Sequence, residues 1–366
     1  LFKKAEKPFL LILNDKEEAA YYLNDLEQMI GEEDVLFYPG SYRRPYQIED
    51  TDNANVLLRA EVLNRINSRK KPAIIVTYPE ALFEKVVTRK ELDKNTLKVA
   101  VGDQISIDFI NEVLFEYEFK RVDFITEPGE FSVRGGIVDV FSFSNDNPYR
   151  IEFFGNEVDS IRSFDVETQL SIEKQKKITI IPNVENKFFQ ENRESFLEYI
   201  NNQTVLFIQD AEGLFTKLDR LFAKATEIFD NLKATVNHVA PNQLFLNQEQ
   251  FIKKSLDFSV VELSSKAIYK TKKTFDFYIK PQPSFNKQFD LLLNNLNDNH
   301  FNGYKNYLFC SNEAQAKRFH DIFESLDEEN SENIRKQYNT IVLPIYQGFI
   351  DEENQLACYT DHQIFE

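Results

Sequence analysis

The chain has 366 residues, of which 42% are hydrophobic and 28% charged, a composition typical of soluble globular proteins with room for roughly two to four domains. Its formal net charge of −17 argues against a large non-specific nucleic-acid-binding face, which needs a basic surface, but is compatible with a small basic patch for a protein partner. No apolar run is long enough to span a membrane and no signal peptide opens the chain, so we expect a cytoplasmic protein. Because the sequence starts at Leu1 rather than at methionine, we also expect it to be part of a longer protein.

Residues 1–118 alternate predicted strands and helices. Short continuous apolar runs, typical of strands buried on both faces, occupy residues 8–13, 35–39 and 73–77. One predicted helix follows Asn14, whose side chain can cap it, and ends near Gly31; another covers residues 54–66. Such alternation predicts a parallel sheet covered by helices.

Residues 119–184 have a different pattern. Their apolar residues alternate at period two, and turn residues such as Pro128-Gly129 and Gly155-Asn156 separate the segments, which predicts a compact insert of antiparallel strands. The α/β pattern returns in residues 185–282 and again in a small region, 283–366, whose role the sequence does not indicate. The predicted fold class is therefore α/β, with a parallel-sheet domain split by a β-rich insert and followed by a small α/β domain.

The predicted strand 149–154 carries the most informative pattern. Tyr149, Ile151 and Phe153 share one face, which is apolar and should face the core. Arg150, Glu152 and Phe154 share the other face. An exposed phenylalanine beside an arginine is typical of a protein-binding hot spot. The alternative is structural: Arg150 could pair with Glu152 or Asp159, and Phe154 could pack under a loop.

The returning strand raises a question of register. Val158 and Ile161 cannot share a face of a regular strand, so we expect a β-bulge between them. Arg162 and Phe164 could then lie on either face, and they are secondary candidates for contact with a partner.

A family resemblance adds to this pattern. Residues 127–171 contain G-E-F-x-x-R-G, then P-Y-R-x-E-F-F, then E-V-D-x-I-R-x-F-D, and this ordered set resembles domain 2 of bacterial transcription-repair coupling factors (Mfd) and of UvrB. Residues 37–66 and 74–82 resemble the surrounding first domain. The ending, 358–366, resembles the junction before the RNA-polymerase-interacting domain. The resemblance implies a UvrB-like domain 1 made of residues 1–118 and 185–282, interrupted by domain 2.

The resemblance also implies a function and a site. In the family, domain 2 binds UvrA through two arginines and an aromatic residue, which correspond here to Arg134, Arg150 and Phe154. The implied role is a UvrA-recruiting scaffold that links RNA polymerase stalled at DNA lesions to nucleotide excision repair. The ATP- and magnesium-dependent DNA translocase and the contacts to RNA polymerase and DNA belong to downstream domains, and the docking surface is masked intramolecularly in the resting protein. This chain itself is expected to be no enzyme and to hold no cofactor.

Two alternatives differ in class. A UvrB-type ATP-dependent damage-binding protein needs a phosphate-binding loop, and nothing in the chain fits G-x-x-x-x-G-K-[ST]. An unrelated α/β hydrolase predicts a pocket with converging polar side chains. Metal binding is not indicated, because the four histidines do not pair with each other or with cysteine at ligand spacing: His238, His300, His320 and His362. Cys310 and Cys358 are predicted to be small buried residues in a reducing cytosol. The basic clusters that could touch DNA are Arg43 with Arg44, and Arg69, Lys70 and Lys71.

Overall fold

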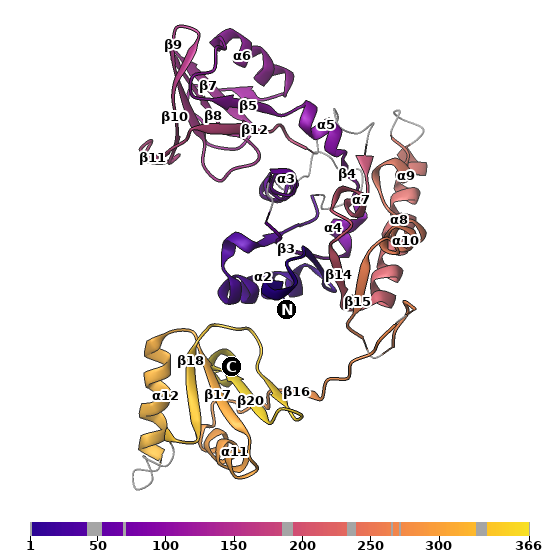
Figure 1. Ribbon diagram of the computed structural model, residues 1–366, viewed down its shortest axis with the longest axis vertical. Helices are drawn as coiled ribbons and strands as arrows, with labels where there is room; N and C mark the ends of the chain where they lie inside the picture. Colours follow the sequence, from indigo (N-terminus) through magenta and orange to yellow (C-terminus); the bar gives the residue numbers. More distant parts are fainter. Residues whose placement is uncertain are drawn as a thin grey trace. The chain divides into compact units, whose positions relative to one another are not determined.

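A computed structural model describes residues 2–41, 53–68, 71–184, 193–232, 239–264, 266–270, 272–326 and 335–365. The chain forms two compact units, one made of residues 1–16 and 36–268 and the other of residues 17–35 and 269–366 (Figure 1). None of the described helices is long and apolar enough to cross a membrane. Cys310 and Cys358 are buried, as predicted.

A parallel sheet forms the base of the first unit. In the described residues its strand order is β15-β14-β1-β3-β2. The strands are β1 (Phe9–Ile12), β2 (Val35–Phe37), β3 (Ile74–Thr77), β14 (Val205–Ile208) and β15 (Ser259–Glu262). Central strand β1 pairs in parallel with β3 on one side and with β14 on the other. Segments that lie before and after the β-rich region therefore share one sheet. Of the apolar runs predicted as buried strands, β1 and β3 are inner strands, whereas β2 lies at the edge of the described sheet.

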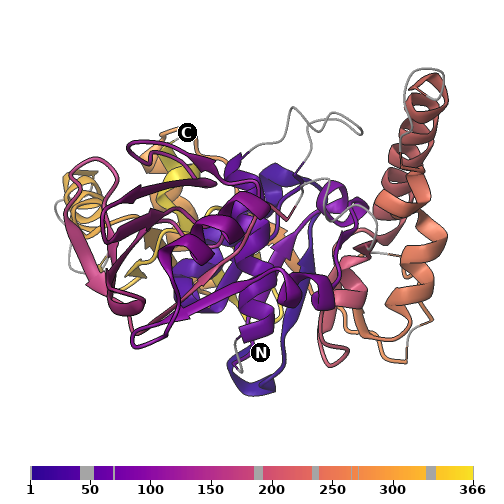
Figure 2. The same cartoon turned by 90° about the horizontal axis from the view of Figure 1, so that it is seen from above.

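Helices surround this sheet. They are α3 (Asn53–Ser68), α4 (Pro79–Phe83), α7 (Phe196–Tyr199), α8 (Ala211–Leu232), α9 (Pro241–Leu244) and α10 (Gln248–Ser255). Helices α8 and α10 lie side by side (Figure 1 and Figure 2), with the rings of Phe215 and Phe251 6.1 Å apart. Short elements complete the parallel-sheet part of the unit: α1 (Phe2–Ala5), and β4 (Val86–Val87) paired with β13 (Arg193–Glu194).

One buried ion pair fixes the loop after β2. The Arg59 side chain is fully buried, and its Nη1 donates to the carbonyl of Pro39 at 2.8 Å and lies 3.2 Å from Glu84 Oε2. Glu84 in turn accepts hydrogen bonds from the amide and the hydroxyl of Ser41. A buried charge of this kind is tolerated only when it is paired and hydrogen-bonded. The pair therefore has a structural role: it holds the backbone of residues 39–41 against Arg59 and Glu84.

The β-rich region is built on a second sheet, whose order in the described residues is β11-β10-β9-β8-β7-β6. Its strands are β6 (Lys120–Arg121), β7 (Glu130–Arg134), β8 (Ile137–Val140), β9 (Tyr149–Phe154), β10 (Glu157–Phe164) and β11 (Ser171–Lys174). Neighbouring strands from β7 to β11 are antiparallel, as predicted, whereas β6 pairs with β7 in parallel.

Elements that precede residue 119, the predicted start of the insert, pack with this region. Helix α6 (Ile107–Glu116) places the ring of Phe115 edge-on to Phe131 of β7, at 5.2 Å. Strand β5 (Leu97–Ala100) pairs with β12 (Lys177–Ile180), and the short helix α5 (Arg89–Lys94) precedes it. The predicted boundary at residue 118 therefore separates elements that the structure pairs.

The turns and the bulge set the register of the sheet. Two-residue turns join β7 to β8 and β9 to β10, and each begins with a glycine at positive φ: Gly135 at +60° and Gly155 at +63°. In β10 the pairing with β9 shifts between Val158 and Ser160. Val158 and Ile161 are consequently both buried, so the predicted β-bulge is confirmed.

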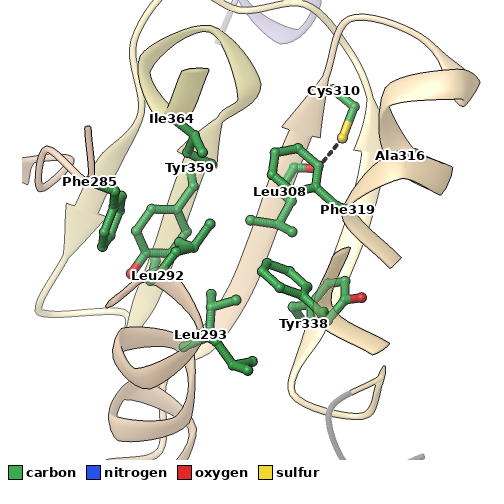
Figure 3. Packing of buried hydrophobic residues seen from close by; sticks show 13 residues of the cluster. Phe285, Leu292, Leu293, Leu308, Cys310, Ala316, Phe319, Tyr338, Tyr359 and Ile364 are labelled. Atoms are coloured by element: carbon green, nitrogen blue, oxygen red, sulfur yellow. Dashed lines mark hydrogen bonds between the residues drawn. The ribbon is translucent and has the colours of Figure 1, made fainter. Parts of the chain in front are cut away.

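The second unit has its own five-stranded sheet, with the order β16-β19-β20-β17-β18 in the described residues. The strands are β16 (Ile279–Pro281), β17 (Lys305–Cys310), β18 (Tyr338–Val342), β19 (Phe349–Asp351) and β20 (Leu356–Thr360), and the helices are α11 (Phe289–Phe301), α12 (Glu313–Leu326) and α14 (Asp361–Phe365). Phe319, Leu308 and Tyr359 lie in the core between sheet and helices (Figure 3). Because β16 already pairs with β19, this unit begins before residue 283, the predicted boundary.

Helix α2 (Lys16–Ile30), followed by the short η1 (Glu32–Asp34), also groups with the second unit. The ring of Tyr21 stacks on that of Tyr346 with the centroids 3.6 Å apart. The carboxylate of Asp25 accepts the backbone N–H of Tyr346 at 3.0 Å. The alternation of strands and helices predicted this helix as a cover of the first sheet, and the structure assigns its aromatic face to the second unit instead.

Candidate functional site

Strand β9 presents the two faces that its sequence predicts. Tyr149 and Ile151 are buried, Phe153 is half-buried, and Arg150 and Glu152 point to the opposite side, where they are partly exposed. Phe154 ends the strand with 84% of its surface exposed. A phenylalanine in that position gains little from folding. The face of the sheet that carries Arg150, Glu152 and Phe154 is called the outer face below.

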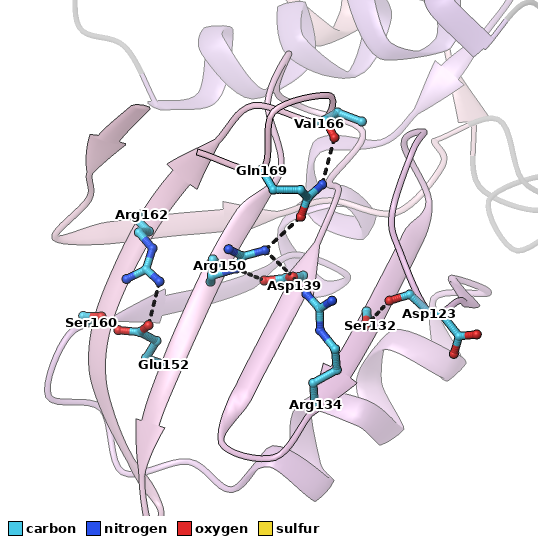
Figure 4. A network of polar contacts seen from close by, with 10 residues as sticks. All are labelled: Asp123, Ser132, Arg134, Asp139, Arg150, Glu152, Ser160, Arg162, Val166 and Gln169. Carbon is cyan, nitrogen blue, oxygen red and sulfur yellow. Dashed lines mark hydrogen bonds and ion pairs between the residues drawn. The ribbon is translucent and has the colours of Figure 1, made fainter. Parts of the chain in front are cut away.

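A buried carboxylate organises the arginines of the outer face (Figure 4). Asp139 of β8 lies directly across from Arg150 in the sheet and is 1% exposed. Arg150 donates from Nε to Asp139 Oδ1 at 2.7 Å and from Nη2 to Oδ2 at 2.8 Å, a bidentate pair. Arg134, at the end of β7, donates to the same Oδ2. The hydrogen bond to Asp139 raises the pKa of Arg150 above its ordinary value, so this guanidinium stays charged.

Further contacts fix the orientation of Arg150. Its guanidinium lies over the ring of Phe164, with the carbon Cζ 4.3 Å from the ring centroid, and Nη2 also donates to Gln169 Oε1 at 3.1 Å. No described residue accepts a hydrogen bond from Nη1, and the side chain is 14% exposed. Arg150 does pair with a carboxylate, as the structural alternative required, but with Asp139 rather than Glu152 or Asp159. One edge of the guanidinium nevertheless remains open to solvent.

Phe164 does not lie at the surface. It is fully buried and forms a small core with Ile125 and Phe141, against which Val122 and Val166 also pack. Val122 and Ile125 come from the segment after β6, and Val166 comes from the segment after β10. The contact of Phe164 with a partner stays a prediction, but the described structure buries its ring, which lies against the Arg150 guanidinium.

Arg162 lies on the outer face and is paired. Its Nη2 donates to Glu152 Oε1 at 2.7 Å, and the side chain is 26% exposed. The hydroxyl of Ser160 donates to the other oxygen of Glu152 at 2.5 Å. The hydrogen bond from Ser160 and then that from Arg162 lower the pKa of Glu152 below its ordinary value. Glu152 is thus an ionised acceptor that holds Arg162 along the sheet.

The structure adds Phe124, which the sequence pattern did not identify. Its side chain is 66% exposed, and the Arg134 guanidinium lies over its ring at 5.2 Å. The sequence pattern of residues 121–125 predicts a strand over the whole segment. Strand β6 instead ends at Arg121, and the chain turns so that Ile125 enters the core and Phe124 faces solvent.

Other candidate chemistry receives little support from the described residues. They contain no group of three or more potential metal-binding side chains, and His238 lies outside them. Of the basic clusters, only Lys71 is described, and it is exposed; Arg43, Arg44, Arg69 and Lys70 lie outside the described residues. A hollow on the first unit is lined by Asp219, Asn247, Gln248, Glu249, Ile252, Lys253 and Leu256. That lining includes no serine, cysteine or histidine, so it does not contain a Ser–His or Cys–His pair.

Comparison with known proteins identifies relatives of this region. The UvrB interaction domain family matches residues 97–186, which include the whole outer face described above. The transcription-repair-coupling factor of Bacillus subtilis is 32% identical over 239 residues, covering 65% of this chain and 19% of that protein. The corresponding factor of Haemophilus influenzae is 26% identical over 235 residues, covering 61% and 20%. That of Rickettsia bellii is 29% identical over 181 residues, covering 49% and 16%. The chain thus spans about a fifth of the length of these relatives.

Proposed function

We propose that this chain, which belongs to the transcription-repair-coupling factor family, recruits UvrA through the outer face of its β-rich sheet. The proposed contact residues are Arg134, Arg150 and Phe154, with Arg162 as a flanking residue. One observation carries the proposal: a phenylalanine that is 84% exposed shares a sheet face with two arginines held by a single buried carboxylate.

The chemistry of this face suits a protein partner. Aromatic side chains and arginines are enriched in protein interfaces and their hot spots. The aromatics bury a large apolar area with few rotatable bonds, and arginine pairs bidentately with carboxylates through its planar fork. Asp139 and Phe164 hold Arg150 in one orientation before any partner arrives, which lowers the entropic cost of binding. Its open Nη1 can then donate hydrogen bonds to a carboxylate of UvrA.

The wider role follows from the family. We infer that the whole protein couples RNA polymerase stalled at DNA lesions to nucleotide excision repair, in the cytoplasm, with this region as its UvrA-docking scaffold. The ATP- and magnesium-dependent translocase activity, and the contacts to RNA polymerase and DNA, are proposed for other parts of the protein. Intramolecular masking of the outer face would keep UvrA away until the motor engages.

A UvrB-type ATP-dependent damage-binding protein is the alternative, because such a protein would share the matched domain. It requires a phosphate-binding loop, and the 366 residues contain no G-x-x-x-x-G-K-[ST] segment. Equilibrium binding of a fluorescent ATP analogue separates the two functions: saturable binding by this chain would favour the UvrB type.

Titration of the chain with purified UvrA tests the docking role directly. Phe154→Ala removes the exposed ring, and Arg150→Lys keeps the charge but loses the bidentate fork. Each should weaken binding by about 30-fold or more, since hot-spot side chains contribute about 2 kcal/mol. Phe301→Ala is the matched control, because Phe301 is 85% exposed on the other unit, and it should bind like the wild type. Equal binding by all variants would remove these residues from the site, and no binding by the wild type would remove the function.

A further inference from the structure

A second exposed aromatic side chain lies beside the proposed docking residues. Phe124 forms one wall of a shallow hollow of about 430 Å³ together with Arg121, Val122, Asp123, Ser132, Val133 and Arg134. The two arginines make the rim more basic than acidic. We propose that this hollow is part of the UvrA-docking surface, with Phe124 as a second aromatic anchor. This inference rests on the proposed function and extends it to a site that the family motif does not include.

Arg134 links the hollow to the described site. Its guanidinium contacts Asp139 on one side and the ring of Phe124 on the other, and the side chain is 42% exposed. A cation held over an aromatic face is stabilised by the ring quadrupole, and more strongly when a partner excludes water from the pair. Phe124 therefore has two effects in a complex: it offers apolar area to UvrA and it holds the arginine fork in place.

The size of a stable interface supports the extension. Specific complexes bury roughly 800 Å² on each partner, which three side chains cannot supply. Arg134 pairs with Ile137 of β8, and Ile137 pairs with Glu152 of β9, two residues before Phe154. With strands about 4.8 Å apart and a rise of about 3.3 Å per residue, the Cα atoms of Arg134 and Phe154 are on the order of 12 Å apart. Including Phe124 extends this footprint past β7 toward β6.

The chemistry of the hollow specifies what it takes. An apolar wall beside Arg121 and Arg134 fits a segment of UvrA that carries a carboxylate next to an apolar side chain. Asp123 on the rim would repel a second carboxylate, which limits the number of acidic groups that the hollow accepts. The interaction is therefore a combined apolar and ionic contact, and raising the salt concentration should weaken it only in part.

The experiment measures Kd for UvrA with Phe124→Ala, Phe124→Leu, Arg134→Ala and the double variant Phe124→Ala/Arg134→Ala. Phe124→Ala should weaken binding about tenfold, and Phe124→Leu by less, because leucine keeps apolar area without the ring. If the ring positions the arginine, the double variant should lose less than the product of the two single losses. Phe301→Ala again serves as the exposed-phenylalanine control.

The outcomes separate this inference from the proposed function. If Phe154→Ala and Arg150→Lys lose binding while Phe124→Ala binds like the wild type, the outer face docks UvrA and the hollow is not part of the site. If the wild type does not bind UvrA, both ideas fall together. Phe124 is 66% exposed, so its replacement should leave the fold intact, which circular dichroism of each variant verifies.

Discussion

Replacing Asp139 by asparagine should loosen the outer face more than any other single charge change in the sheet. Asparagine keeps the shape of the side chain but removes the charge that receives three hydrogen bonds from Arg150 and Arg134. Breaking a buried ion pair costs about 3–5 kcal/mol because the remaining charge is left desolvated. The Arg150 side chain is only 14% exposed, so without Asp139 it would be close to a buried, unpaired charge. The Arg134 side chain is 42% exposed and can turn toward water at a cost of about 0–1 kcal/mol.

The amide oxygen of asparagine can still accept one of these bonds, so we expect a loss of about 3 kcal/mol in local stability. Because the chain has two compact units, a global unfolding curve would mix their transitions. Hydrogen exchange of peptides from β8 and β9, measured by mass spectrometry, reports the β-rich region alone. A loss of 3 kcal/mol corresponds to exchange that is about a hundredfold faster.

Asp159→Asn is the matched control, because Asp159 is an exposed carboxylate at the bulge of β10. It should change exchange by less than about twofold to threefold. The double variant Asp139→Asn/Arg150→Met should lose less stability than the two single variants added together, because it removes both charges of the buried pair. Exchange within about fivefold of the wild type in Asp139→Asn would refute the reasoning: the arginines would then have found other partners.

Three further predictions concern single sites. The pKa of Glu152 is lowered in the folded protein, mainly by the hydrogen bond from Ser160. The stabilisation that ionised Glu152 contributes is therefore present above the unfolded pKa of about 4.3, and it is lost as the pH falls through the folded pKa. Glu152→Gln should therefore destabilise the sheet near neutral pH and less so in acid, as hydrogen exchange at two pH values measures; a pH-independent effect would contradict this. Phe164→Ala should cost about 3–5 kcal/mol, because the ring is fully buried. Hydrogen exchange of peptides from β9 and β10 measures this loss, and exchange at the wild-type rate would show that assignment to be wrong. Burial raises the pKa of Cys310 to about 12 and that of Cys358 to about 11. A thiol reagent at neutral pH should therefore modify both cysteines only after denaturation. Modification of the native protein within minutes would show that the thiols are accessible.

The local features of the site follow from the sequence because a strand has a fixed period. In β9, the alternation of Tyr149, Ile151 and Phe153 with charged residues predicts which side faces the core, and the structure agrees. In β10, the odd spacing of Val158 and Ile161 predicts the bulge, which the pairing with β9 confirms. Such patterns depend only on side-chain direction along one strand.

Features that join distant segments were not predictable in this way. Asp139 lies between two buried valines in β8, and this alternation indicates that its side chain is on the outer face. Its pairing with Arg150, however, depends on the register between two strands. The burial of Phe164 depends on side chains from both flanking segments, which the period of its own strand does not reveal. Likewise, the partner of Tyr21 in α2 is Tyr346, more than three hundred positions along the chain.

The pairing of β5 with β12 has a consequence for protein engineering. Leu97 lies opposite Ile180 in an antiparallel ladder, so the Cα atoms at the two ends of the β-rich region are only about 5 Å apart. A region whose ends meet can be excised as a self-contained cassette or inserted into another host without stretching either chain. The outer face, from Phe124 to Arg162, lies wholly within that cassette. If the outer face binds UvrA as we propose, that binding should be transferable to another protein by grafting this region through its neighbouring ends.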